Sequence, residues 1–140
     1  MIKGLHHAGL SVKDLDRSIQ FYCLLGMELL RRGVWEGGPM DPITELTGTR
    51  GRSAMLSVGA QHLELFEFAA PTGRPADPAR PVCDHGITHF CIEVADVESE
   101  YRRLAVAGVR FHCAPQEFKG AKATYARDPD GNVVELVQLG

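Results

Sequence analysis

The sequence lacks the features that mark membrane, secreted and nucleic-acid-binding proteins. No apolar run approaches the roughly 20 residues that a membrane-spanning helix needs. The formal net charge is -3, so no excess of positive charge predicts nucleic acid or an anionic membrane as a partner. The N-terminus has no basic region followed by an apolar block, and no signal peptide is expected.

The 4 cysteines include no C-x-x-C pair. A chain of 140 residues can bury a hydrophobic core without covalent crosslinks, so free thiols are the simpler prediction. Free thiols favour a cytoplasmic protein, although a periplasmic protein with disulfides is an alternative. The composition is 44% hydrophobic and 24% charged, which is typical of one globular domain spanning residues 1–140.

A short pattern occurs twice in the chain. "GLHHAGLSVKD" begins at Gly4 and "GITHFCIEVAD" at Gly86, and their superposition places His7 on His89. Further along, the segment "LELF" of the first copy aligns with "VELV" of the second, which superposes Glu64 on Glu135. The first copy is longer between its histidine and its glutamate, which indicates an insertion, most simply within 33–52. Two modules of one ancestral design are therefore predicted.

Each copy predicts one strand, one helix and three further strands. Apolar residues recur at helical spacing after Asp14 and again after Asp96, each of which is a plausible N-cap. The strands are expected near 5–12, 28–34, 53–58 and 62–68 in module one, and near 87–94, 109–113, 123–127 and 132–138 in module two. The proline-rich segment 71–86 has no hydrophobic period, so it is expected to link module one (1–70) to module two (87–140).

The repeated histidines and glutamates predict a metal site. Strand alternation puts His7 on a face with small residues, while the apolar face packs under the helix. Glu64 and Glu135 stand between apolar neighbours, where a carboxylate is costly unless it is paired or binds a metal. Imidazole and carboxylate together suit divalent Zn, Fe, Mn, Co or Ni. The alternative is a core histidine hydrogen-bonded to a carboxylate.

The motifs of both copies are similar to those of the vicinal oxygen chelate superfamily, whose members include glyoxalase I, methylmalonyl-CoA epimerase, extradiol dioxygenases and bleomycin resistance proteins. The matching segments are "HHAGLSVKDLDRSIQFY", "LGMEL", "HLELFE", "GITHFCIEVADVE" and "DPDGNVVELVQ". The resemblance implies an α+β fold, in which two βαβββ modules form a curled mixed-sheet cup around one metal ion. In the metal-binding isomerases of this family, the ligands come from the first and last strands of each module. Those positions are His7, Glu64, His89 and Glu135 here.

The resemblance, with four ligands, implies a metal-dependent isomerase or lyase of the glyoxalase or methylmalonyl-CoA epimerase type. A glutamate would remove a proton next to a carbonyl, and the metal would stabilise the enediolate or enolate. Glu135 is the first choice for the base and Glu64 for its partner, and the pseudo-symmetry leaves their order open. An extradiol dioxygenase, with a two-histidine, one-carboxylate site, and a metal-free bleomycin-type binder are the alternatives.

The substrate is expected to be a small molecule with vicinal oxygens. Ser11 stands where the glyoxalase I pattern has an arginine for glutathione, and "GRSAMLS" lacks the extra acid of the epimerases. Arg52, Tyr125 and Trp35 are candidate substrate contacts, with Trp35 on the insertion, which is either a mobile loop or a lid. His6 is expected on the face opposite His7, as a structural or surface residue. A homodimer is expected, and whether the site lies within one chain or is shared between two remains open.

Overall fold

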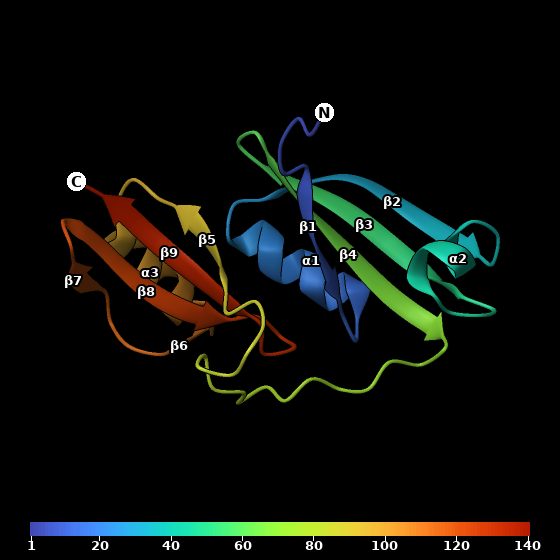
Figure 1. Ribbon diagram of the computed structural model, residues 1–140. Helices are drawn as coiled ribbons and strands as arrows, with labels where there is room; N and C mark the ends of the chain where they lie inside the picture. The colour runs from blue at the N-terminus through green and yellow to red at the C-terminus, as the bar shows by residue number, and fades with distance from the viewer. The chain divides into compact units, whose positions relative to one another are not determined.

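The computed structural model describes all 140 residues as two compact units, Met1–Pro75 and Ala76–Gly140. Figure 1 follows the chain through both units. No helix of the chain is long and apolar enough to cross a membrane. All the cysteines are free thiols.

The first unit is a four-stranded mixed sheet covered by one helix. The sheet has the order β1-β4-β3-β2, with β1 parallel to β4 and the other neighbours antiparallel. Helix α1 packs against β3 and β4. The elements are β1 (His7–Ser11), α1 (Leu15–Leu24), β2 (Glu28–Glu36), α2 (Met40–Thr44), β3 (Arg50–Val58) and β4 (Gln61–Ala70).

The second unit repeats this arrangement. Its sheet has the order β5-β9-β8-β6, with β5 parallel to β9, and α3 packs against β8 and β9. The elements are β5 (Phe90–Glu93), α3 (Val97–Val106), β6 (Arg110–Phe111), β7 (Gln116–Phe118), β8 (Ala121–Arg127) and β9 (Val133–Leu139). The predicted α+β class of two βαβββ modules is confirmed, with the short strand β7 added to the edge of β8.

Both main helices begin as the sequence predicted. The carboxylate of Asp14 accepts a hydrogen bond from the backbone N–H of Arg17 at 3.0 Å, and that of Asp96 accepts one from Ser99 at 3.0 Å. The pKa of the Asp96 carboxyl is lowered, chiefly by the bond from the Ser99 amide. These caps satisfy amides that have no partner within the first turn.

A second contact ties each helix start to the last strand of its module. Glu67 on β4 accepts the backbone N–H of Leu15 at 2.7 Å. Gln138 on β9 accepts that of Val97 at 3.1 Å. Glu67 and Gln138 occupy equivalent positions in the two copies, each following the repeated glutamate by the same interval, so the repeat extends to this contact. It anchors each helix above the strand that carries the repeated glutamate.

The buried faces of β4 and β9 fix where the repeated glutamates point. Leu63 and Leu65 are 3% and 0% exposed, and Glu64 lies between them on the opposite face of β4. Val134 and Leu136 are likewise buried at 0% and 1%, on either side of Glu135. A register slip of one residue would turn the glutamates into the core, so burial of the flanking apolar side chains holds both carboxylates on the face away from the helix.

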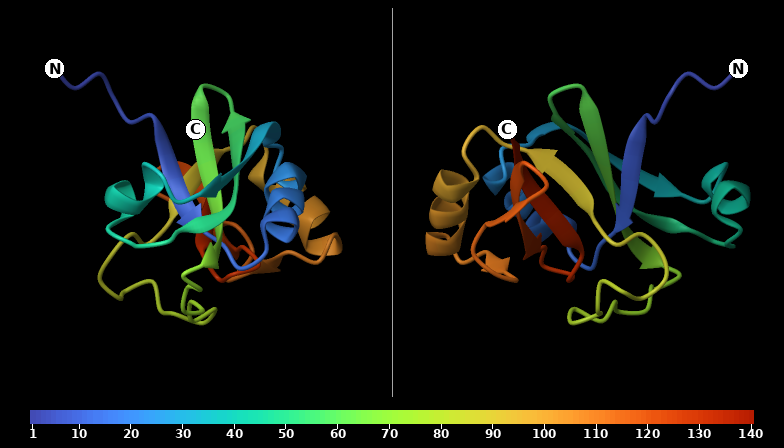
Figure 2. Two further views of the ribbon diagram at one scale, coloured as in Figure 1. Left: turned by 90° about the vertical axis from the view of Figure 1, so that its right-hand side faces the viewer. Right: turned by 60° about the vertical axis from the view of Figure 1, so that its left-hand side comes forward.

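The insertion of the first module differs from the predicted loop. Residues 33–36 belong to β2 and pair with residues 50–53 of β3, so much of the insertion lengthens a hairpin. Only 37–49 connect the two strands, with the short helix α2 at the tip of the hairpin (Figures 1 and 2). This extension was not predicted, because glycines interrupt the alternation of apolar residues there. Trp35 consequently lies on strand β2, paired with Gly51 of β3.

Asp41 holds the connection between β2 and β3 in place. One carboxylate oxygen accepts the Thr49 hydroxyl at 2.6 Å and the Thr49 amide at 2.8 Å. The other oxygen accepts the Gly48 amide at 2.8 Å. These bonds, led by the one from the Thr49 hydroxyl, lower the pKa of the Asp41 carboxyl. Thr49 itself is fully buried.

Asp41→Ala is expected to loosen this connection without unfolding the module. Amide hydrogen exchange at Gly48 and Thr49, followed by NMR, should accelerate about tenfold because each loses its acceptor. Because the folded pKa is lowered, the stabilisation by Asp41 is present above the ordinary value of 3.8 and is lost as the pH falls through the folded value. Asp41→Asn, which keeps one oxygen acceptor, is the matched control. Unchanged exchange in Asp41→Ala would show that the carboxylate does not hold the loop.

Candidate metal centre

The first module pairs His7 with Glu64. Strands β1 and β4 are parallel neighbours, and their register sets Gly9 beside Glu64. His7, two positions before Gly9, reaches the carboxylate with Nε2 at 3.2 Å from Oε2. The side chains of His7 and Glu64 are 37% and 19% exposed, so the pair is open to solvent within its module.

The second module pairs His89 with Glu135 in the same way. Cys91 is the register partner of Glu135, and His89 stands two positions before Cys91. The distance from His89 Nε2 to Glu135 Oε2 is 3.0 Å, and the side chains are 27% and 20% exposed. The repeat in sequence therefore corresponds to a repeat in side-chain geometry, one imidazole and one carboxylate in each module.

Each His–Glu pair offers two donor atoms of the kinds that divalent transition metals bind. The carboxylates are partnered by imidazole, so a cation could take their oxygens without breaking an ion pair to lysine or arginine. No group of three or more His, Cys, Asp or Glu side chains is gathered closely enough to hold a metal ion. One module alone thus presents half of the four-ligand set that the sequence predicted.

Tyr125 lies beside the pair of the second module. It is the register partner of Glu135 on β8, and its hydroxyl is 3.3 Å from His89 Nδ1. Desolvation, followed by the charge of Glu135, raises the pKa of Tyr125. Met55 is the register partner of Glu64 in module one, so the two pairs have different neighbours. The structure thus brings the predicted substrate contact Tyr125 to the His89–Glu135 pair.

Cys91 also distinguishes the second pair from the first. Cys91 is an exposed residue, and its thiol hydrogen-bonds with the Glu135 carboxylate. Desolvation, with the carboxylate of Glu135 next in effect, raises the pKa of Cys91 to about 12. A thiol that stays protonated is a hydrogen-bond donor, so it orients the carboxylate and does not compete as a thiolate ligand.

Two residues make contacts with the paired histidines that were not predicted from the sequence. His6 Nδ1 lies 2.8 Å from His7 Nδ1, and the His6 ring stacks on His62 with centroids 5.4 Å apart. Thr88 Oγ1 lies 2.9 Å from His89 Nδ1. The expected separation of His6 from His7 across the strand is wrong, because β1 begins only at His7 and strand alternation does not apply to the residue before it. The signal that could have found both residues is the superposition of the two copies, which also relates position 6 to position 88.

Arg52 lies on the helix-facing side of β3. Its guanidinium donates to Glu67 at 2.7 Å and to Asp16 at 3.0 Å. The bond from Arg52 lowers the pKa of the Glu67 carboxyl. The pKa of the Asp16 carboxyl is lowered first by a hydrogen bond from Arg32 and next by the one from Arg52. Arg52 therefore stabilises the contact between α1 and the sheet. Its contact with substrate stays a prediction, and such a contact would compete with these ion pairs.

Trp35 packs in an aromatic cluster on the same face of the first sheet as Glu64. Its ring lies 5.9 Å from that of Phe66 and 5.2 Å from that of Phe68, both edge-on. Gly51 makes room for it, since a Cβ there would come within 2.6 Å of the indole. The indole N–H is buried without a hydrogen-bond partner. A substrate contact by Trp35 stays a prediction, now for a residue of strand β2.

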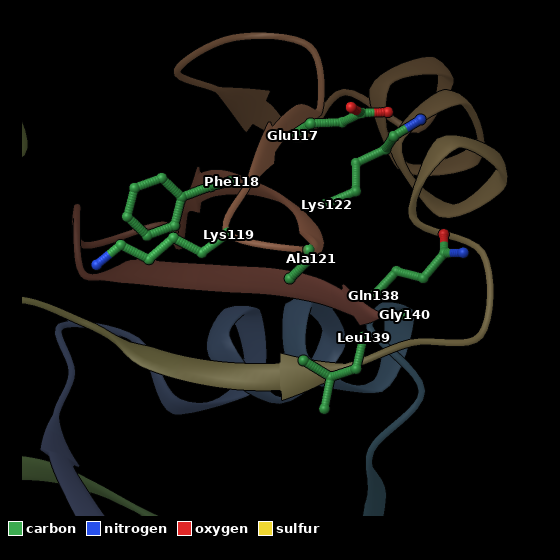
Figure 3. Close-up of a pocket in the computed structure, with 9 residues that line it drawn as sticks. Glu117, Phe118, Lys119, Ala121, Lys122, Gln138, Leu139 and Gly140 are labelled. Carbon is green, nitrogen blue, oxygen red and sulfur yellow. The ribbon is translucent and has the colours of Figure 1, made fainter.

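An open pocket lies elsewhere in the second unit. It has a volume of about 550 Å³ and is formed at the β7–β8 turn and the end of β9. Figure 3 shows the side chains of Phe118 and Lys119 beside this turn. The residues that line it, 117–122 and 138–140, include none of the predicted ligands or substrate contacts.

The chain belongs to the glyoxalase/bleomycin resistance protein/dioxygenase superfamily. The family model matches residues 4–136, which include both modules and all four repeated His and Glu residues. This finding confirms the resemblance seen in the motifs and the fold class built from it.

Two curated relatives carry enzyme names. A 2-epi-5-epi-valiolone epimerase from Actinomyces sp. is 35% identical over 151 residues, covering 97% of this chain and 79% of the relative. A probable lactoylglutathione lyase from Synechocystis sp. is 27% identical over 141 residues, covering 96% and 94%.

Solved structures share the fold. A glyoxalase family protein from Bacillus cereus superposes with a TM-score of 0.91 at 24% identity, over 100% of this chain and 97% of the other. The glyoxalase I of Leishmania major, described as trypanothione-dependent, gives a TM-score of 0.69 at 27% identity, over 98% of this chain and 87% of the other.

Proposed function

We propose that this protein is a metal-dependent isomerase or lyase that moves a proton at a carbon next to a carbonyl. The observation that carries the proposal is the repeated pairing of a partly exposed imidazole with a partly exposed carboxylate, at 3.2 Å in one module and 3.0 Å in the other. A binding protein without metal has no need for this matched set.

His7, Glu64, His89 and Glu135 are the proposed ligands of one divalent metal ion, within one chain or shared between the two chains of a homodimer. Two imidazole nitrogens and two carboxylate oxygens suit zinc, nickel, cobalt, manganese or iron. When bound, such an ion supplies Lewis-acid stabilisation for the negative charge that develops on a carbonyl oxygen.

A glutamate of the site performs the proton transfer. Glu135 is the proposed base and Glu64 its partner, since a carboxylate within hydrogen-bond reach of a carbon acid can remove its proton and return it. The protonated thiol of Cys91 and the hydroxyl of Tyr125 lie beside Glu135, and module one offers neither group to Glu64. The hydrogen bond from the Cys91 thiol holds the Glu135 carboxylate in one orientation while it accepts and returns the proton.

The proposed substrate class is a small polyoxygenated ketone or a related carbonyl compound with vicinal oxygens. The epimerase among the relatives acts on 2-epi-5-epi-valiolone, and epimerisation next to a ketone needs the proton removal proposed here. The lactoylglutathione lyase names support proton transfer in a thiol adduct as the second substrate class. Ser11 lies at the position where the glyoxalase I pattern has an arginine for glutathione. The polyoxygenated ketone is therefore the preferred substrate class over the thiol adduct.

Two measurements test the proposal. The protein is purified, its metal content is determined, and the metal-free form is titrated with zinc, nickel, cobalt, manganese and ferrous ions. Each metal form is then incubated in D₂O with 2-epi-5-epi-valiolone, the hemithioacetal of glutathione and methylglyoxal, acyl-CoA thioesters and 2-oxoacids, and deuterium uptake is followed by proton NMR. Metal at one equivalent per site and metal-dependent exchange in one class are expected. Failure to bind any of these ions would overturn the proposal in favour of a metal-free binding protein.

A further inference from the structure

One face of the first sheet carries the His7–Glu64 pair, and the strand register shows which other side chains share that face. The row through Glu64 continues on β3 with Met55 and on β2 with Arg31. Register partners on neighbouring strands point to the same side of a sheet, so Arg31 lies on the face of the proposed metal ligands. Strand β2 is an edge of this sheet (Figure 1), and Arg31 is exposed there.

An irregularity in β2 decides which arginine reaches this face. Leu29 pairs with the fully buried Leu56 on the helix side, and regular alternation would return Arg31 to that side. The register instead shifts between Leu29 and Arg31, as in a β-bulge, so that Arg32 faces the helix and Arg31 faces away from it. The bond from Arg32 to Asp16 on α1, at 2.6 Å, agrees with this orientation. Bulges commonly re-aim a side chain beside a functional site.

The guanidinium of Arg31 makes no ion pair, unlike those of its neighbours. Arg32 and Arg52 both donate to Asp16 on the helix side, at 2.6 Å and 3.0 Å. Arg31 has no carboxylate partner. A guanidinium stays charged at physiological pH and presents a fork of donors that fits a carboxylate or a phosphate group. Arg31 is therefore available to an anion that approaches the face of Glu64.

The next row of the same face leaves room for a small ligand. It consists of Ser11, Phe66, Ser53 and Gly33, in strand order from β1 to β2. A Cβ at Gly33 would come within 3.0 Å of the Ser53 hydroxyl, so a larger residue there would press on that hydroxyl. The two serine hydroxyls can each donate to and accept from the oxygens of a polyol. This row thus suits a small oxygen-rich molecule lying between Glu64 and Arg31.

The spacing of the strands sets the length of such a molecule. Glu64 on β4 and Arg31 on β2 are separated by the single strand β3. Neighbouring strands lie about 4.8 Å apart, so the two backbones are roughly 10 Å apart. Met55, which is 5% exposed, lies between them. A ligand whose reacting carbon is at Glu64 therefore reaches Arg31 with a group that is only a few bonds further along.

We propose that Arg31 is a specificity-determining residue that binds an oxyanion, a carboxylate or a phosphate, on the carbonyl compound that reacts at the proposed metal site. The substrate class is thereby narrowed to small polyoxygenated carbonyl compounds that carry an anionic group a few bonds from the carbonyl. The inference rests on the proposed function for the reacting end of the substrate, whereas the residues that carry the anion subsite all belong to module one. The guanidinium touches no reacting atom, so it contributes affinity and leaves the proton transfer itself unchanged.

Three hydroxyketones of similar size test the subsite. Dihydroxyacetone is neutral, dihydroxyacetone phosphate carries a phosphate, and 5-hydroxylevulinate carries a carboxylate. Their dissociation constants are measured by NMR titration of the protein amide signals, with the wild type and with Arg31→Gln, in the presence and absence of zinc. Arg31→Gln should weaken binding of the anionic probes about 10-fold to 100-fold, as expected for loss of a hydrogen bond to a charged group, and should leave the neutral probe unchanged. The anionic probe that loses more identifies the group that Arg31 binds.

Arg32→Gln is the matched control, because it removes the same charge from the adjacent position on the opposite face. It should leave the affinity for all three probes nearly unchanged. Arg31→Lys keeps the charge but not the fork of donors, so it should lose less affinity than Arg31→Gln. In the deuterium-exchange measurement, Arg31→Gln should raise KM for an anionic substrate and leave kcat unchanged, which is the pattern for a residue that contributes to binding alone.

The outcomes separate this inference from the proposed function. Equal affinity of the wild type and Arg31→Gln for both anionic probes would overturn the subsite, and so would a wild type that binds neither of them. Equal losses in Arg31→Gln and Arg32→Gln would also overturn it, because net charge would then explain the effect. A protein that binds no metal and exchanges no deuterium would overturn the proposed function, while the affinities measured without zinc would still decide the role of Arg31.

Discussion

His7→Ala and His89→Ala are each expected to lower the affinity for a divalent metal by more than the roughly 10-fold to 100-fold that follows loss of an outer-shell partner. Each variant removes one of four proposed ligands, and the remaining glutamate loses the imidazole that now partners it at 3.2 Å or 3.0 Å. Competition with a chromophoric chelator measures the affinity, and equal losses from the two variants would reflect the equivalence of the two modules.

The control for these variants is His85→Ala, which removes an exposed histidine from the segment between the modules. In His7→Ala and His89→Ala, the circular dichroism spectrum and the thermal unfolding temperature should change little, since both ligand side chains are partly exposed and lie on the face away from the helix. Full metal affinity in either His7→Ala or His89→Ala would remove that histidine from the ligand set and with it the symmetric site.

The elements that the sequence predicted well are those fixed by local chemistry. Asp14 and Asp96 cap the helices, because short-range hydrogen-bonding rules decide where a helix begins. The pairing of each histidine with its glutamate was also predictable in outline, since the repeat and the apolar neighbours of the glutamates set the register. The contact of each pair stays within one module.

Other features depend on contacts that no local rule reveals. The strand β7 exists because Lys119 and Gly120, with φ of 49° and 81°, form a tight turn that returns the chain along β8. The positions of Arg52 and Cys91 were not predictable, because each is set by a carboxylate from a distant part of the chain: Glu67 holds the first and Glu135 the second. Long-range ion pairs and thiol contacts depend on which strands become neighbours.

The two modules therefore share their repeated histidine and glutamate but differ in the side chains that surround each glutamate. Glu135 lies beside the thiol of Cys91 and the ring of Tyr125, whereas Glu64 lies beside Gly9 and Met55. Two carboxylates with the same backbone position but different neighbouring side chains have different freedom to move. This difference makes the roles of the two glutamates separable by experiment.

Glu135→Gln is expected to slow deuterium exchange at the acidic carbon of the substrate by roughly 10²–10⁴, the contribution of general base catalysis. Glutamine keeps the shape and one oxygen ligand but accepts no proton at neutral pH, so metal stays bound, more weakly. Exchange is measured by proton NMR in D₂O at saturating metal, so that the weaker binding does not enter the rate. Cys91→Ser is the companion variant, because it keeps a donor beside Glu135 and should retain most of the exchange.

Glu64→Gln, measured under the same conditions, decides between one base and two. If Glu64 is chiefly a ligand, its loss should slow exchange much less than loss of Glu135, and the reaction is a proton shift on one face of the substrate. If both variants lose exchange equally, the two carboxylates serve opposite faces, which is the requirement for epimerisation and agrees with the activity named for the Actinomyces relative. Wild-type exchange by Glu135→Gln would exclude Glu135 as the base, and faster exchange by Glu135→Gln than by Glu64→Gln would transfer that role to Glu64. The donors around Glu135 would then serve to hold a ligand, and the open surface at Gly9 would be where the substrate meets its base.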